Sequence, residues 1–372
     1  MVLVTLVGAA SIYAGKKDYL ASATPHDYSV AGNKVDLTST KKLMDDFLIK
    51  TGEQANEEVA VSYLLFGIKN QETNKLTVFT KNERKVVPKS IVLVFSQETF
   101  KQLTGKELNL SSNQIALYTK NKTLKTQKSL SIDGKNYQIH RQLGDFINKK
   151  IPNIYKIIVS DYSYLVVPDI KIFESSMKGT SIAQATYVGV NVKDPTHDAK
   201  KNSDLLDHMT DKATQQLAGQ TTGVSQSYLT ANSRYDAEGM VNGFVGGTFF
   251  IGIFLSIIFM LGTVLVIYYK QISEGYEDRE RFVILQKIGL DDLQVKQTIR
   301  KQVLTVFFLP LIFAFIHLAF AYHMISLIVR IIGVLNPDLM LVVTIIVCGV
   351  FFLAYVLVFA LTSRSYRRIV SM

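Results

Sequence analysis

Val245 to Tyr269 reads VGGTFFIGIFLSIIFMLGTVLVIYY and contains no Asp, Glu, Lys or Arg. A helix rises about 1.5 Å per residue and the hydrocarbon core of a bilayer is about 30 Å thick, so about 20 apolar residues cross it. Two later stretches, Val303 to Val329 and Leu339 to Thr362, are also uncharged and long enough. A buried helix of a soluble protein is the alternative, but three such stretches in succession with basic flanks favour an integral membrane protein.

The first fifteen residues, Met1 to Gly15, are uncharged as well, but they would form a helix of only about 22 Å. A signal peptide is one interpretation, yet the stretch has no basic n-region and no clean small-x-small cleavage site before Lys16. We therefore expect a partial membrane span whose remaining residues lie upstream of Met1.

The distribution of basic residues predicts the orientation in the membrane. Seven of them lie between the second and third spans, close to the span ends, whereas the loop between the last two spans has only Arg330. Positive charge marks the cytoplasmic side. The expected order is a partial span at 1–15, an extracytoplasmic domain at 16–240, a span at 244–269, a cytoplasmic amphipathic loop at 270–302, spans at 303–329 and 337–362, and a basic cytoplasmic tail at 363–372.

The large polar region reads as an α+β domain, so the predicted fold class is four transmembrane helices with this domain between the first and second. Short runs rich in Val, Ile, Tyr and Phe separated by turn signals predict strands. They are Val59–Ile68, Leu76–Thr80, Ile91–Phe95, Ile115–Thr119, Tyr137–His140, Tyr155–Val159, Tyr164–Val167 and Thr186–Val192. Helical spacing predicts helices at Thr38–Ile49, Gln97–Leu103 and Asn202–Leu217. A stretch rich in Gln, Ser, Thr and Gly, Thr214–Ser233, is expected to be a stalk or linker.

Charge and cysteine content limit the possible environments of this domain. Between Lys16 and Glu238 there are 30 basic and 24 acidic residues, a net charge of +6. That excess could attract anionic lipids, cell-wall polymers or lipid carriers, although +6 over such a length also describes an ordinary solvated surface. Cys348, the single cysteine, lies in the last apolar stretch. The domain therefore has no disulfide, which suits a Gram-positive bacterium.

The polar residues give little sign of catalysis. Asp204, Asp207, His208 and Asp211 fall on one helical face and could meet a cation, but an ordinary solvated face is the better explanation. His197 and Asp198 are loop candidates of the same kind. The chain has no phosphate-binding loop, no Gly-x-Ser-x-Gly, no His-Glu-x-x-His and no kinase signature. We expect no enzyme activity, no metal, no cofactor and no nucleic-acid partner.

Small residues near the start of the second span predict a helix-packing seam. Gly243 and Gly247 are four residues apart, and Gly252 and Ser256 repeat the spacing. Small side chains at this spacing allow two helices to approach closely. The alternative is the general abundance of Gly in membrane helices.

The third span contains three candidate gating residues. Pro310 removes a backbone donor and should bend the helix, and His317 and His323 lie farther along it. Each imidazole could serve gating or simply bond to a neighbouring helix. Beyond this span, Asn336-Pro337-Asp338 predicts a helix start, with Asn as the cap and Pro at the first position.

The segment Glu277–Gly289 reads EDRERFVILQKIG and places Phe282, Leu285 and Ile288 on one helical face beside basic residues. A basic amphipathic helix lying on anionic head groups is one interpretation. Docking into another protein is the alternative hypothesis.

This segment resembles the FtsX-like permease family, whose cytoplasmic loop carries a pattern close to E-R-R-x-E-I-G-I-L-R-A-L-G. The matching residues are Glu277, Arg279, Glu280, Arg281, Phe282, Ile284, Leu285, Lys287 and Gly289. The resemblance extends from about Tyr268 to Tyr322, and over this range the sequence is similar to the bacitracin-resistance type of ABC transporter permease. By that resemblance the chain looks like the C-terminal portion of such a permease.

The resemblance implies several partners and a multi-pass location in the cell membrane. They are a cytoplasmic ABC ATPase that binds the ATP, a sensor histidine kinase, and a peptide antibiotic or its lipid-linked cell-wall target, with membrane lipids around the spans. ATPase coupling would pass through Glu277, Arg279, Arg281, Phe282, Leu285, Ile288 and Gly289. The alternatives are an FtsX-like permease for a lipid or lipoprotein, a membrane-anchored binding or sensor module, and a membrane enzyme.

Overall fold

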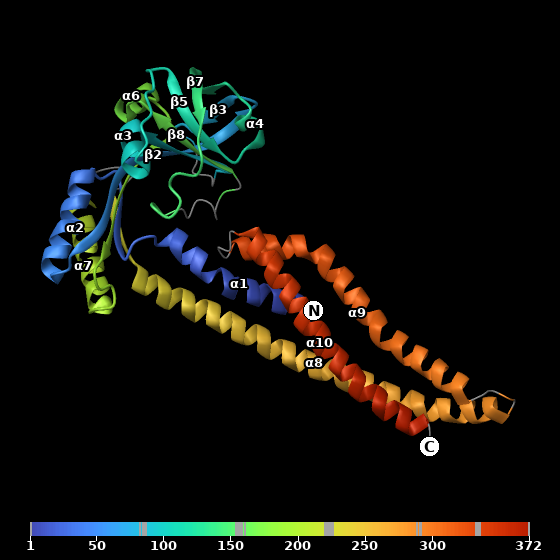
Figure 1. Ribbon diagram of the computed structural model, residues 1–372. Coiled ribbons are helices and arrows are strands. Elements are labelled where there is room, and N and C mark those ends of the chain that lie inside the picture. Colours follow the sequence, from blue (N-terminus) through green and yellow to red (C-terminus); the bar gives the residue numbers. More distant parts are fainter. Residues whose placement is uncertain are drawn as a thin grey trace. The chain divides into compact units, whose positions relative to one another are not determined.

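The computed structural model describes residues 2–81, 83, 88–152, 159, 161–218, 227–287, 289, 292–331 and 336–370. The chain divides into two compact units (Figure 1). Tyr19–Val241 forms a sheet unit, and Met1–Asp18 together with Asn242–Met372 forms a helical unit.

In the part of the chain that the structure describes, the sheet unit contains ten strands in one mixed sheet. The strands are β1 (Tyr28–Asn33), β2 (Ala55–Glu72), β3 (Lys75–Val78), β4 (Ser90–Ser96), β5 (Gln114–Thr119), β6 (Ser129–Ile132), β7 (Lys135–Gln142), β8 (Asp161–Val167), β9 (Ile182–Val192) and β10 (Tyr228–Ser233). The helices are α2 (Leu37–Thr51), α3 (Gln97–Thr104), α4 (Lys122–Lys125), α6 (Ile170–Ser176) and α7 (Ala199–Ala218).

Strand β2 is the long central element of the sheet. Its 18 residues pair with β9 over Ala55–Phe66, with β4 over Leu64–Ile68 and with β3 over Ile68–Glu72. Because β4 pairs back with β2, the order β2-β3-β6-β7-β5-β8-β4 closes on itself. We call these strands, with α3, α4 and α6, the barrel-like lobe. The pairs β3–β6, β4–β8 and β5–β7 are parallel.

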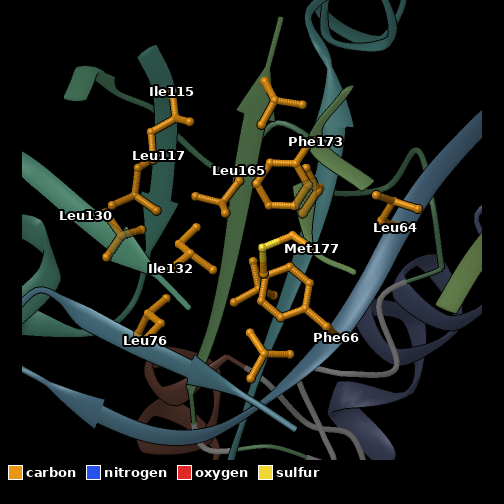
Figure 2. Close-up of a cluster of buried hydrophobic side chains, with 14 of the residues drawn as sticks. Leu64, Phe66, Leu76, Ile115, Leu117, Leu130, Ile132, Leu165, Phe173 and Met177 are labelled. Atoms are coloured by element: carbon orange, nitrogen blue, oxygen red, sulfur yellow. The ribbon is translucent and has the colours of Figure 1, made fainter. Parts of the chain in front are cut away.

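The interior of the barrel-like lobe is a cluster of buried aliphatic and aromatic side chains (Figure 2). Leu64 and Phe66 of β2 meet Leu165 of β8 there, because alternate residues of a strand point to the same face. Phe173 and Met177, from α6 and its C-terminal end, join the same cluster. All of these side chains are less than 5% exposed.

The remaining strands, in the order β10-β1-β9-β2, form the helix-covered lobe, with α2 and α7 packed against each other beside them (Figure 1). Phe47 of α2 and Leu206 of α7 are buried with Tyr28, Val30 and Val188 of the sheet. Helix α2 begins where the Asp36 carboxylate accepts a hydrogen bond of 2.8 Å from Ser39 N.

Most of the predicted elements of this unit are confirmed, with boundaries that differ by a few residues. All three predicted helices are present as α2, α3 and α7, and seven of the eight predicted strands are present. The eighth, Tyr155–Val159, lies mostly outside the described residues. Strands β1, β6 and β10 were not predicted, because each is short and polar enough to lack clear alternation.

The prediction of a stalk or linker at Thr214–Ser233 is wrong at both ends of this stretch. Its first residues continue α7 to Ala218, and its last residues form β10, which pairs with β1. The Thr214 hydroxyl donates a 3.1 Å hydrogen bond to Leu229 O and accepts one of 2.9 Å from Leu229 N, which ties the two ends together. The polar residues at the two ends of this stretch therefore belong to a helix and to an edge strand, and they do not mark a linker there.

The helical unit consists of α1 (Val2–Ala23), α8 (Arg234–Lys287), α9 (Asp292–Ile331) and α10 (Pro337–Val370), of which α1 and α8 begin or end in the sheet unit. Among the described residues, three segments are long and apolar enough to cross a membrane: Arg234–Glu277, Phe308–Arg330 and Pro337–Ala360. Their large apolar side chains face outward, with Phe250 69%, Phe320 83% and Leu353 68% exposed. Such surfaces require lipid, so the chain is a membrane protein.

Two sequence expectations differ from the helices observed here. Helix α1 continues eight residues beyond the expected 1–15 and is not among the three spanning segments, so the fourth span stays a prediction. The segment expected as a loop from 270 is helical to Lys287 and again from Asp292. The predicted cap of α10 is confirmed, because Asn336 Oδ1 accepts hydrogen bonds from Asp338 N and Leu339 N at 3.0 and 3.2 Å.

We predict that Phe66→Ala destabilises the sheet unit, since Phe66 is 1% exposed in the lobe interior. The cavity should cost about 4 kcal/mol and lower the melting temperature by about 10 °C. Thermal unfolding of the full chain in non-ionic detergent, followed by circular dichroism, measures the shift. Ile172→Ala, at a side chain that is 65% exposed, is the control, and equal shifts for both variants would contradict the packing described.

Candidate functional site

The most elaborate polar arrangement of the sheet unit lies where α1 ends and α8 begins. Arg234, the first residue of α8, donates from Nη1 to Asp27 Oδ1 at 2.8 Å and from its backbone N to Asp27 O at 2.8 Å. Its Nη2 and Nε donate to the carbonyl oxygens of Pro25 and Thr24, just beyond the last residue of α1. We call this set of contacts the Arg234 clamp.

Asp27 also connects the clamp to strand β9. Its Oδ2 accepts a hydrogen bond of 3.0 Å from Val192 N, and its backbone N donates to Asn191 Oδ1 at 3.1 Å, both in β9. The Asp27 side chain is only 8% exposed, so its charge depends on the guanidinium for compensation. The clamp therefore ties the exit of α1 to β1, β9 and the start of α8.

His26 fills the space directly beside the clamp. Its Nδ1 lies 2.9 Å from the Tyr187 hydroxyl, and the side chain is 3% exposed. A Cβ at Gly189 would lie 2.4 Å from this Nδ1, so only glycine leaves room for the ring. Burial lowers the pKa of His26, with the Arg234 charge acting in the same direction against Glu57 and Asp27. Burial also raises the pKa of Tyr187, so the phenol keeps its proton and shares a hydrogen bond with the imidazole.

The start of α8 is capped and attached to α7. Ser233 Oγ accepts a hydrogen bond of 3.1 Å from Asp236 N, and Asp236 Oδ2 accepts from the hydroxyls of Ser233 and Ser203. The spacing of Ser followed three residues later by an acid is that of a capping box, but the Asp236 carboxylate accepts from the Ser233 hydroxyl and not from its backbone N–H. The pattern Ser233-x-x-Asp236 was available in the sequence and would have placed the helix start well before the apolar stretch.

Within the helical unit, α1 packs antiparallel along α8. Tyr13 stacks on Phe249 with ring centroids 4.7 Å apart, and Lys16 Nζ donates to Asn242 Oδ1 at 2.8 Å. A Cβ at Gly252 would lie 2.7 Å from Ala9 Cβ, so Gly252 permits the close approach.

The other residues of the expected packing seam behave differently from Gly252. Ser256 is buried at 4% exposure, as a packing role would require. Gly243 and Gly247 have no atom within 4 Å of an added Cβ among the described residues. The structure thus brings only half of the expected seam into tight packing.

The expected gating residues lie on α9, where Leu311 packs with Tyr355 of α10 in a small apolar cluster. Pro310 lies next to this cluster but is itself exposed, as are His317 and His323. The described residues thus do not bring the two imidazoles together or bury them.

The expected coupling residues belong to the last turns of α8 and the residues after it. Glu277 and Arg281 are exposed, and Gly289 has a φ of +108°. Arg279, Phe282 and Leu285 have helical backbone, whereas Ile288 lies outside the described residues.

The acidic face of α7 is solvated, and no cation site forms on it. Asp204, Asp207, His208 and Asp211 are all exposed. Burial raises the pKa of Asp207, and the neighbouring Asp236, Asp211 and Asp204 add to the effect. His197 Nδ1 lies 3.9 Å from Glu53 Oε1, and Lys201 Nζ forms an ion pair with Asp198 Oδ2 at 3.6 Å. Among the described residues, no group of three or more His, Cys, Asp or Glu is placed to hold a metal.

Parts of the chain are similar in sequence to known membrane transport proteins. The chain is 36% identical over 72 residues to the ABC transporter permease protein YxdM, 30% over 121 residues to the uncharacterized ABC transporter permease YvcS, and 29% over 140 residues to the bacitracin export permease protein BceB, all from Bacillus subtilis. These matches cover 19%, 32% and 38% of this chain and 12%, 18% and 19% of the respective relatives. No family model matches the chain.

The membrane helices and these relatives together define the class: the chain is related to ABC transporter permeases. Within that class one relative is the bacitracin export permease protein BceB, in agreement with the resemblance of the Glu277–Gly289 segment to this type of permease. The matched part spans less than a fifth of the length of each relative.

Sequence reasoning missed the Arg234 clamp entirely. Asp27 and Arg234 are more than 200 residues apart, and no motif in the sequence links the two positions. Only the pairing of β1 with β10 brings them together.

We predict that Arg234→Ala destabilises the sheet unit by about 3 kcal/mol, because it leaves the Asp27 carboxylate buried without its counter-charge. Thermal unfolding of the full chain in detergent measures the loss. Lys41→Ala, which breaks a pair between partly exposed side chains, should cost less than about 1 kcal/mol. A double variant Asp27→Asn/Arg234→Ala that is no more stable than Arg234→Ala would argue against charge compensation.

We also predict a pH dependence that arises from His26. Because its pKa is lowered in the folded protein, the unfolded chain takes up a proton that the folded chain refuses below about pH 6.5. Stability should therefore fall between pH 7.5 and pH 5.5 more steeply in the wild type than in His26→Gln. Melting temperatures of both proteins at the two pH values test this, and parallel slopes would refute it.

Proposed function

We propose that this chain is part of an ABC transporter permease that transmits the ATP-driven motion of a partner ATPase to its sheet unit. The relationship to ABC transporter permeases carries the proposal. The continuity of α8 supports it, because one helix holds both Arg234 of the clamp and the Glu277–Lys287 segment. The ATPase would bind and hydrolyse the nucleotide, and the permease chain would not act as an enzyme.

The proposed route begins at the cytoplasmic end of α8. By helical spacing, Phe282, Leu285 and Ile288 share one face, with Arg279 and Arg281 nearby, which suits docking into a groove of a partner subunit. Movement follows only if the ATP-bound partner contacts one arrangement of this segment better than another.

The route ends at the Arg234 clamp in this proposal. A turn or shift of α8 would act on Asp27, because the guanidinium and the backbone N of Arg234 both donate hydrogen bonds to that residue. Through Asp27 the movement would reach β1 and β9. The antiparallel contact of α1 with α8 at Gly252 would make the two helices move as a pair. The clamp would thus connect both helices to the sheet.

We further propose that the sheet unit lies outside the cell and that the permease serves resistance to peptide antibiotics directed at the cell wall. Seven basic residues in the last turns of α8 and the first turns of α9 support this orientation. One relative is named a bacitracin export permease, which supports the substrate class. A sensor histidine kinase would be a further partner, and His317, His323 and Pro310 would be candidates for gating.

We predict that Leu285→Asp abolishes co-purification of the partner ATPase from membranes, because it places a charge in the apolar docking face. Val283→Asp is the matched control, since it introduces the same charge on the opposite side of the same helix by 3.6-residue spacing. The measurement is an affinity pull-down from native membranes with the nucleotide-hydrolysis rate of the eluate, alongside bacitracin susceptibility of the cells.

Loss of the ATPase with Leu285→Asp but not with Val283→Asp, together with increased susceptibility, is the expected result. Retained binding and normal resistance in Leu285→Asp would refute the docking assignment. If the wild type brings down no ATPase at all, a binding or sensor module becomes the better interpretation.

A further inference from the structure

The net charge of the sheet unit is concentrated in one part of its chain. Residues 97–152 carry ten basic and four acidic residues, whereas 19–96 carry ten and nine, and 153–241 carry eight and ten. The excess of +6 is thus not spread over more than 200 residues, as the sequence average suggested. It belongs to the barrel-like lobe, in which α4 and β5–β7 lie (Figure 1).

Hydrogen bonds join three segments of this lobe into one continuous surface. The β6–β7 hairpin donates from Ser131 N to Asn74 O at 2.8 Å and from Asp133 N to Leu76 O at 2.9 Å, at the turn between β2 and β3. Asn121, the cap of α4, donates from Nδ2 to Gln71 Oε1 of the same turn at 3.3 Å.

Five lysines extend from these joined segments, and we call them the lysine face. They are Lys75 of β3, Lys122 and Lys125 of α4, Lys128 before β6, and Lys135 of β7. All five are exposed, and none of them forms an ion pair within the described residues.

Neighbouring charges do not neutralise the lysine face. Lys69, close by, already pairs with Glu83, and Lys120 lies 5.2 Å from the centroid of the Tyr162 ring. The acidic residues of the same segments are Glu72 and Asp133, and Asp161 of β8 lies next to them, where its Oδ2 accepts a hydrogen bond of 3.2 Å from Asn121 Nδ2. The five lysines outnumber these three carboxylates. A partner with repeated negative charges would relieve the mutual repulsion of these lysines.

The surroundings of the lysines indicate what kind of anion fits. Exposed hydroxyl and amide groups lie between them, including Thr123, Thr126, Ser129 and Asn136. Among the described residues from 50 to 171, no large hydrophobic side chain is exposed. Just beyond that range, Ile172 of α6 is 65% exposed and lines a hollow together with Lys135. Surfaces that bind a bilayer insert several apolar side chains beside their basic residues, whereas this single isoleucine lies beside one of the five lysines. A soluble chain of anionic groups needs only lysines and hydrogen-bond donors.

We propose that the lysine face binds a soluble linear polyanion. The binding is electrostatic: several lysines contact successive charges along one flexible chain, and bound counterions are released. This interaction does not depend on the coupling of the chain to an ATPase.

The test measures binding of end-labelled linear polyphosphate, and separately of poly-L-glutamate, to the full chain in non-ionic detergent by fluorescence anisotropy at several salt concentrations. The variant is Lys122→Gln/Lys125→Gln/Lys128→Gln. The matched control is Lys42→Gln/Lys200→Gln/Lys212→Gln, which removes three exposed charges from α2 and α7 of the helix-covered lobe. Unchanged melting temperatures verify that both variants are folded.

The variant in the lysine face should bind polyphosphate at least about tenfold more weakly, and its plot of log affinity against log salt should be shallower by about 2. The control should stay within about twofold of the wild type. Binding of poly-L-glutamate with the same lysine dependence supports the proposal, with charge spacing rather than phosphate as the recognised feature. Equal losses in both triple variants, no polyanion binding by the wild type, or lysine-dependent binding only to phosphatidylglycerol vesicles would overturn it.

Discussion

The two helices that connect the sheet unit to the rest of the chain enter it through neighbouring strands. This follows from the antiparallel pairing of β1 with β10, which sets Tyr28 opposite Ser233. The Arg234 clamp closes the pairing at its end, where the helices meet the sheet. Because Asp27 is nearly buried, separating it from Arg234 would leave an uncompensated charge, so the two helix ends are held together by more than backbone hydrogen bonds.

Helix α8 meets different demands along its length. Its first turn is polar and capped by Ser233, its middle presents large apolar side chains outward, and its last turns are charged. In lipid a continuous helix satisfies every backbone donor and acceptor within itself, so the apolar part needs no partner for its main chain. Close packing is still present at Gly252, where α1 approaches.

The two lobes of the sheet unit differ in charge although they share β2. The helix-covered lobe carries the acidic face of α7, with Asp204, Asp207 and Asp211, and the barrel-like lobe carries the lysine face. The core of each lobe is formed by a different part of β2, since Ala60 packs with the first and Leu64 and Phe66 with the second. One strand therefore joins two lobes whose exposed residues differ in charge.

The membrane helices, most strands and helices of the sheet unit, and the relationship to ABC transporter permeases can be predicted from the amino-acid sequence. These depend on local features, namely uncharged stretches of sufficient length, alternating or helical spacing, and one contiguous motif at Glu277–Gly289. Only the tertiary structure decided that Thr214–Ser233 ends in a strand, that Arg234 meets Asp27, and that lysines from three segments share one surface. Each of these depends on contacts between residues far apart in the chain, and such contacts follow from strand pairing, which local periodicity does not specify.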